Sequence, residues 1–174
     1  MGFHAAVAEP RTTQWTNVHE VENGGMMRIL HTAINEWLDP LVKPPITQEQ
    51  LNRYAVASGD HNPIHLDEEA AHRVGLDGVI AHGMLSMAFL GQFVSQHIAD
   101  IPGAYIEQLK ARFVNMVHLG DTITCHGIVK ERITDEAAST VPATHVIVEC
   151  WAQNQKGNKV TTGEAVISVP HRSN

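Results

Sequence analysis

The stretch GMLSMAFLGQFVSQHIA, residues 83–99, decides the fold, because its apolar side chains cover nearly the whole circumference of a helix. A helix that is apolar on almost all sides must be surrounded by other structure. After residue 102 the hydrophobic period changes from 3.6 to 2. This pattern predicts four strands, near 104–118, 121–133, 144–155 and 158–169. We therefore expect an α+β protein in which an antiparallel meander wraps one long helix.

The chain has 174 residues, which fits one domain. Residues 1–27 show no sustained periodicity, and we interpret them as a mobile or extra N-terminal arm before a domain at 28–174. Two alternatives stay open for this arm. It is a vector-derived or misassigned start before Met26 or Met27, or it is a real element that packs on the domain.

Charge and composition exclude several classes of function. The formal net charge of −7 argues against nucleic-acid binding. No apolar run approaches the roughly 20 residues that cross a bilayer, so we expect no membrane association. Cys125 and Cys150 have no CxxC spacing and no signal peptide before them. We expect both to be reduced thiols in a cytoplasmic protein.

Local signals place a short acidic and basic segment at the end of a helix. Thr47 is a predicted N-cap, with Gln50 completing a capping box. That helix must stop near Gly59, since glycine adopts backbone angles that other residues avoid. Asp60 is therefore expected just after a helix end, and Asp67 is expected to begin a second short helix.

Asp60 and His65 are the candidate catalytic residues. The turn between them, which contains Asn62 and Pro63, can direct a carboxylate and an imidazole at one volume, where they would activate a water molecule. For an arbitrary Asp and His pair, turn capping is the commoner role. The tight Ser-Gly-Asp-x-Asn-Pro-x-His context favours catalysis instead. Asn62 is more often a turn residue than a catalytic one, and we assign it a supporting role.

Gly83 is the candidate oxyanion residue, because the first N–H groups of a helix have no internal partner and carry the positive end of its dipole. A glycine needed only for tight helix packing is an equally good interpretation of this position alone. His82 and Met84 flank it and are candidate substrate contacts.

Two further groups of residues are candidate ligands of a metal or of a phosphate. A metal site is disfavoured, because Pro63 removes the helical face that His61 and His65 would need at their i, i+4 spacing. We expect neither a metal nor another cofactor.

Lys110 and Arg112 alternate with apolar residues on a predicted strand, which is usual for the solvated face of a sheet. If the substrate carries phosphates, these two cations are the first candidates to bind them.

The segment Tyr54-x-x-Ala-Ser-Gly-Asp-x-Asn-Pro-Ile-His-x5-Ala71 resembles the hydratase motif of the MaoC-like dehydratases, the R-specific enoyl-CoA hydratases. Family-like segments at 41–47, 78–84 and 112–122 follow in the right order, so the resemblance covers roughly residues 40–169. Met116 departs from the pattern, since relatives often have proline there.

The resemblance implies a hot-dog fold, a homodimer or higher homo-oligomer, and a role in fatty acid metabolism. It implies (R)-specific hydration of trans-2-enoyl thioesters, or the reverse dehydration of (R)-3-hydroxyacyl thioesters. Asp60 and His65 would be the dyad, Asn62 a supporting residue, and the Gly83 N–H the contact of the thioester oxygen. The substrate would be an enoyl-CoA or 3-hydroxyacyl-CoA, with an acyl-carrier protein as the alternative carrier.

Two other functions fit the same fold. An acyl-CoA thioesterase usually needs a carboxylate on or near the central helix, and residues 83–98 contain none. A non-catalytic acyl-thioester-binding protein has no reason to present a paired acid and base.

Overall fold

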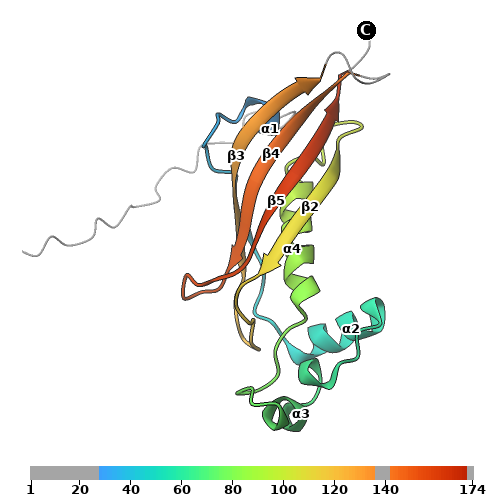
Figure 1. Ribbon diagram of the computed structural model, residues 1–174, viewed down its shortest axis with the longest axis vertical. Helices are drawn as coiled ribbons and strands as arrows, with labels where there is room; N and C mark the ends of the chain where they lie inside the picture. Colours follow the sequence, from blue (N-terminus) through green and yellow to red (C-terminus); the bar gives the residue numbers. More distant parts are fainter. Residues whose placement is uncertain (1–27, 136–141, 172–174) are drawn as a thin grey trace, which may run out of the picture.

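The computed structural model describes residues 28–135 and 142–171. A five-stranded antiparallel sheet forms its centre, and helix α4 (Gly83–Gln96) lies along one face of that sheet (Figure 1). The four long strands are β2 (Tyr105–Phe113), β3 (Thr124–Asp135), β4 (Ala143–Gln153) and β5 (Lys159–Pro170). The predicted α+β class, with a long helix covered by antiparallel strands, is confirmed. The arm expected at 1–27 lies outside the described residues.

Helix α4 supplies the centre of the core, as its apolar circumference predicts. Leu90 and Phe93 on this helix are completely buried. They pack in one cluster with inward side chains of β3, β4 and β5. Gly127 on β3 makes this packing close, because a Cβ there would lie 2.7 Å from Cε1 of Phe93. Helix and sheet therefore share a single hydrophobic core.

The expected four-strand meander is wrong for its first strand. The sheet order is β1-β3-β4-β5-β2, so β2 pairs with β5 and not with β3. Beyond the end of β2 at Phe113, Val114 N still donates to Val160 O of β5 at 2.9 Å, and the backbone then bonds to loops outside the sheet. Ala81 N donates to Val117 O at 2.7 Å, and Gly120 N donates to Ile46 O at 2.8 Å. Residues 114–123 thus cross from one side of the sheet to the other.

Three short helices lie beyond one end of the sheet, next to the N-terminal end of α4 (Figure 1). They are α2 (Gln48–Ser58), the 3₁₀ helix η1 (Pro63–His65) and α3 (Glu68–Arg73). The predicted N-caps are confirmed: Thr47 accepts from Gln50 N at 3.2 Å, and Asp67 accepts from Ala70 N at 2.7 Å. The segment with the acid and the imidazole therefore sits at the start of the central helix.

Two short elements precede these helices. Helix α1 spans Arg28–His31, and strand β1 (Leu41–Val42) pairs with β3 at the edge of the sheet. Within residues 28–135 and 142–171, every helix is too short or too polar to pass through a bilayer.

Candidate active site

The end of α2 positions Asp60. Gly59 terminates the helix with a φ of 76°, in the left-handed region that favours glycine, and its N–H still donates to Ala55 O at 2.9 Å. The N–H of Asp60 then donates to the hydroxyl of Ser58 at 3.2 Å. Asp60 is exposed and held just after the helix end, where the sequence predicts it.

Asn62 makes the turn that follows. Its side-chain oxygen accepts from Ile64 N at 3.3 Å, which starts η1. Its backbone N–H donates to Oδ1 of Asp60 at 3.1 Å. Asn62 therefore orients the carboxylate through its main chain, while its side chain makes the turn.

His65 is buried, and its ring is fixed in one tautomer. Nδ1 lies 2.8 Å from the carbonyl oxygen of Ile80. A carbonyl only accepts, so Nδ1 carries the proton and donates it. In the neutral ring the lone pair is therefore on Nε2, which has no hydrogen-bond partner among the described residues. Gln48 supports the same turn by donating to the backbone oxygen of His65 at 3.1 Å.

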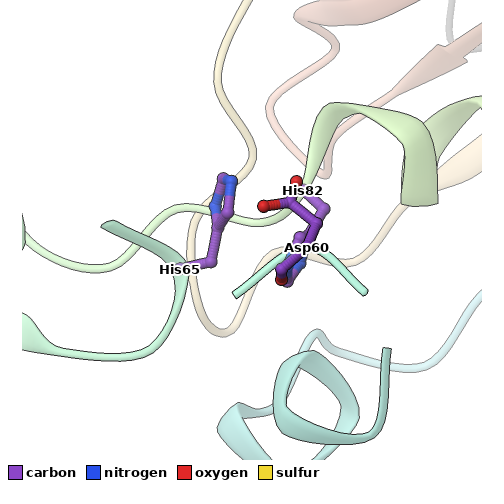
Figure 2. Close-up of side chains that lie close together, drawn as sticks. All are labelled: Asp60, His65 and His82. Atoms are coloured by element: carbon purple, nitrogen blue, oxygen red, sulfur yellow. The ribbon is translucent and has the colours of Figure 1, made fainter. Parts of the chain in front are cut away.

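His82 joins the acid and the base. Its Nε2–H donates to the backbone oxygen of Asp60 at 3.0 Å, and its ring lies 4.0 Å from the ring of His65 at an angle of 30°. Figure 2 shows the three side chains together, and one ligand-type atom from each lies within 4.8 Å of the others. Burial lowers the pKa of His82, despite the opposing hydrogen bond to Asp60 O, so this ring favours the neutral form.

Gly83 begins α4, and none of the described residues accepts a hydrogen bond from its N–H. The ring of Phe113 is the nearest neighbour that a Cβ at this position would meet, at 3.4 Å. Ser86, one turn further along, donates to Gly83 O at 2.7 Å and lies 2.6 Å from the hydroxyl of Thr161 on β5. The first turn of the helix is thereby anchored to the sheet while its N–H stays available.

A cleft of about 990 Å³ opens beside these residues. It contains the ring of His65 and the exposed start of α4 at Gly83. Its walls come from the crossover at 113–121 and from the β4–β5 hairpin at 154–158. The cleft therefore offers a substrate a path from the imidazole and the free N–H to the outside.

Several predicted site residues lie elsewhere. Lys110 and Arg112 line a separate hollow on the outer face of the sheet, and Lys110 lies 3.9 Å from Glu164. Met84 is exposed but does not line the cleft. His82 lines the cleft with only 2% of its surface exposed, and its Nε2 is occupied by Asp60. Of the six predicted site residues besides the dyad, three thus lie at the site: Asn62 next to Asp60, Gly83 at the start of α4, and His82 in the cleft wall.

The structure adds partners that the sequence did not indicate. Ile80 fixes the His65 ring, Gln48 supports its turn, and Thr161 anchors Ser86. The first two contacts involve backbone oxygens, which carry no residue signature. The apolar neighbourhood of Thr161 on β5 was the one available signal, since a hydroxyl completely buried there needs a partner.

The acidic and histidine residues of this region that could bind a metal are only partly brought together. Asp60, His65 and His82 cluster, whereas Asp67 caps α3. Two ring nitrogens in the cluster already donate to carbonyls. That no metal is needed stays a prediction.

The fold is the hot-dog fold, with a carboxylate and an imidazole at the start of its central helix. The model of the MaoC-like domain matches residues 30–151, and the chain belongs to the MaoC-like dehydratase family.

Relatives and solved structures agree with that assignment. The chain is 29% identical over 146 residues to "(R)-specific enoyl-CoA hydratase" of Rhodospirillum rubrum. The aligned residues cover 83% of this chain and 95% of the relative. It is 31% identical over 85 residues to "Probable enoyl-CoA hydratase 2" of Dictyostelium discoideum, covering 49% of this chain but only 29% of that longer protein. The unliganded R-hydratase PhaJ1 of Pseudomonas aeruginosa superposes with a TM-score of 0.66 at 29% identity, covering 84% and 88% of the two chains.

Proposed function

We propose that the chain is a hydro-lyase that adds water to the double bond of trans-2-enoyl thioesters with (R) stereochemistry, or removes water in the reverse direction. The observation that carries the proposal is the convergence of Asp60 and His65 beside the free N–H of Gly83. The names of the hydratase and dehydratase relatives support the same reaction class.

The tautomer of His65 explains how water is held. Because Nδ1–H donates to Ile80 O, the two groups that face the reaction are acceptors: the lone pair on Nε2 and the carboxylate of Asp60. A water between them donates one O–H to each, and its oxygen lone pair is free to attack C3 of the substrate. One O–H bond breaks as the O–C3 bond forms, and the dyad delivers a proton to C2.

Gly83 completes the chemistry. Addition at C3 places negative charge on the thioester oxygen, since the double bond is conjugated with the carbonyl. The Gly83 N–H, at the positive end of the α4 dipole, donates to that oxygen. The dyad and this N–H thus act on opposite ends of one conjugated system.

The decisive experiment measures hydration of crotonyl-CoA by Asp60→Asn and His65→Ala. Asp60→Asn replaces the basic carboxylate by a neutral amide, and His65→Ala removes the imidazole, so we expect each to lower kcat by about 10²- to 10⁴-fold with the circular dichroism spectrum unchanged. His126→Phe is the control, since His126 packs against Trp37 and Trp151, away from the dyad. Full turnover by both dyad variants would overturn the proposal.

A thiol assay separates this function from a thioesterase on the same fold. Thioester hydrolysis releases free CoA thiol, whereas hydration does not. The protein's own cysteines should give little background, because burial raises the pKa of Cys125 and of Cys150 to about 12. Tight acyl-CoA binding without either reaction would instead favour a non-catalytic binding protein.

We further propose a homodimer joined along β2. This strand lies at one edge of the sheet and carries exposed Tyr105 and Phe113 at its ends. A long edge strand with apolar ends is a template for pairing with a second sheet. Light scattering after size exclusion tests this, and a monomer at micromolar concentration would contradict it. The two free thiols are consistent with a reducing compartment, for which we propose the cytoplasm.

A further inference from the structure

The β4–β5 hairpin presents a rigid tip to the cleft. Oδ1 of Asn154 accepts from the N–H groups of Lys156 and Asn158, both at 3.1 Å. Gly157 completes the turn with a φ of 79°. Asn154, Lys156 and Asn158 all line the cleft that contains His65. The hairpin tip is thus a built part of the cleft wall.

The next residue ties this tip to the crossover. Gln155 Nε2 donates to Oδ1 of Asp121 at 2.9 Å, and Gln155 Oε1 accepts from Thr122 N at 3.0 Å. Oδ2 of Asp121 accepts from His118 N at 2.9 Å. Both oxygens of the buried acid are therefore engaged within the protein. Asp121 is the only acid that lines the cleft among the described residues, so the positive charge of Lys156 faces no unpaired carboxylate there.

Lys156 is the only lysine or arginine among the described residues that line the cleft. Its ammonium has no hydrogen-bond or ion-pair partner within residues 28–135 and 142–171. Two lysines on the outer face of the sheet do have ion-pair partners: Lys110 lies 3.9 Å from Glu164, and Lys130 lies 3.7 Å from Glu149. In a chain with a formal net charge of −7, an unpaired cation beside the site is a specific local feature.

We propose that Lys156 binds a phosphate of the carrier, CoA or acyl-carrier protein, that holds the acyl group through a pantetheine arm. This inference rests on the proposed function. Enoyl thioesters of CoA and of acyl-carrier protein share a 4′-phosphate at the end of that arm, and CoA carries further phosphates beyond it. With the thioester oxygen at Gly83, the arm leaves along the cleft toward the hairpin. Lys156 there meets the phosphate as a point charge, the role in which lysine commonly binds phosphate.

The test combines changes in the protein with changes in the substrate. Wild type, Lys156→Gln, Lys156→Glu and the control Lys130→Gln are assayed with four crotonyl thioesters: those of CoA, 3′-dephospho-CoA, 4′-phosphopantetheine and pantetheine. We expect Lys156→Gln to raise KM for crotonyl-CoA about fivefold without changing kcat, the upper range for a solvent-exposed ion pair. Lys156→Glu should raise KM further, and Lys130→Gln should match wild type.

The substrate series identifies the phosphate. With crotonylpantetheine, which has no phosphate, Lys156→Gln and wild type should have equal KM. An effect that persists with the 4′-phosphopantetheine thioester assigns the contact to the phosphate common to both carriers. An effect that disappears without the 3′-phosphate assigns it to CoA alone.

Two results would overturn the inference while leaving the proposed function intact: an unchanged KM for crotonyl-CoA in Lys156→Gln, or an equal rise with crotonylpantetheine. If instead wild type hydrates none of the thioesters, the proposed function fails, and calorimetry with CoA alone still tests Lys156. In that case Lys156→Gln should weaken CoA binding about fivefold relative to Lys130→Gln. Equal affinity of the two variants would refute the phosphate contact.

Discussion

The imidazole of His82 donates to the backbone carbonyl of Asp60, so the residue before Gly83 holds the main chain of the proposed catalytic carboxylate. The same ring lies against the ring of His65. One buried side chain thus connects the turn after α2, η1 and the start of α4. His82 therefore links Asp60, His65 and Gly83 by direct contact.

His82→Phe should lower kcat for crotonyl-CoA by about 10- to 100-fold, the range seen when a residue that orients a reacting group is replaced. Phenylalanine keeps an aromatic ring beside His65 and Tyr54 but removes the N–H that holds Asp60. KM should change less than kcat. His126→Phe, which replaces another partly buried histidine outside the site, should retain full activity. Wild-type turnover in His82→Phe would show that the hydrogen bond is dispensable.

Gly83→Ala and Gly163→Ala should have opposite consequences. A Cβ at Gly83 meets only the Phe113 ring at 3.4 Å, so stability should change by less than about 1 kcal/mol. The methyl group obstructs the thioester oxygen, and kcat/KM should fall by about 10²-fold.

A Cβ at Gly163 would lie 2.6 Å from the backbone oxygen of Lys110, which cannot move without disturbing the β2–β5 ladder. Urea unfolding should show Gly163→Ala destabilised by about 1–3 kcal/mol. Unfolding of Gly83→Ala at lower urea than Gly163→Ala would contradict this assignment.

The hydroxyl pair of Ser86 and Thr161 should show a coupled effect on stability. The Ser86 hydroxyl donates to Gly83 O, so the Thr161 hydroxyl donates to Ser86. Ser86→Ala leaves a buried hydroxyl without a partner and should cost about 1–3 kcal/mol. Thr161→Val should cost less, because Ser86 keeps its bond to Gly83. In a double-mutant cycle the loss for the pair should be smaller than the sum, and strict additivity would argue against the contact.

Stability should fall as the pH is lowered below about 7. Burial lowers the pKa of His82 and of His126 from the ordinary value of 6.5. Between that value and each lowered pKa, the unfolded chain binds more protons than the folded chain, so acid favours unfolding. Each histidine contributes a slope of at most about 1.4 kcal/mol per pH unit. Urea unfolding from pH 8 to pH 5 measures it, and His82→Phe should give a shallower slope than wild type.

Much of the site could be predicted because its signals are local. Thr47 and Asp67 cap helices through backbone groups three residues away. Gly59 ends α2 because it adopts a positive φ, which glycine does more readily than other residues. The all-round apolar pattern of residues 83–96 required a covered helix. These features depend on neighbours in the sequence, which a single chain displays directly.

The remaining features depend on distant pairs. Strand periodicity does not reveal which strands pair. The sequence therefore predicts a meander of four consecutive strands, whereas β2 pairs with β5. Lys110 and Arg112 alternate correctly along β2, yet only the sheet shows that they face away from the cleft. Lys156 reaches the cleft because Gln155 binds Asp121, a contact between separate turns. No residue pattern in one segment carries such information.

The pairing of β2 with β5 has a consequence for the order of folding. Strands β3, β4 and β5 join through consecutive antiparallel pairs, so each can pair with the strand that directly precedes it in the chain. Strand β2 precedes these three strands in the chain, but it can pair only after β5 has formed. Bringing β2 to β5 closes a long loop, and the entropic cost of this closure comes before any β2–β5 hydrogen bond forms. Helix α4 precedes β2 directly and docks on the same core. We expect the rate-limiting step of folding to be this late closure, and we expect the turn that carries Asp60 and His65 to become ordered only once it is complete.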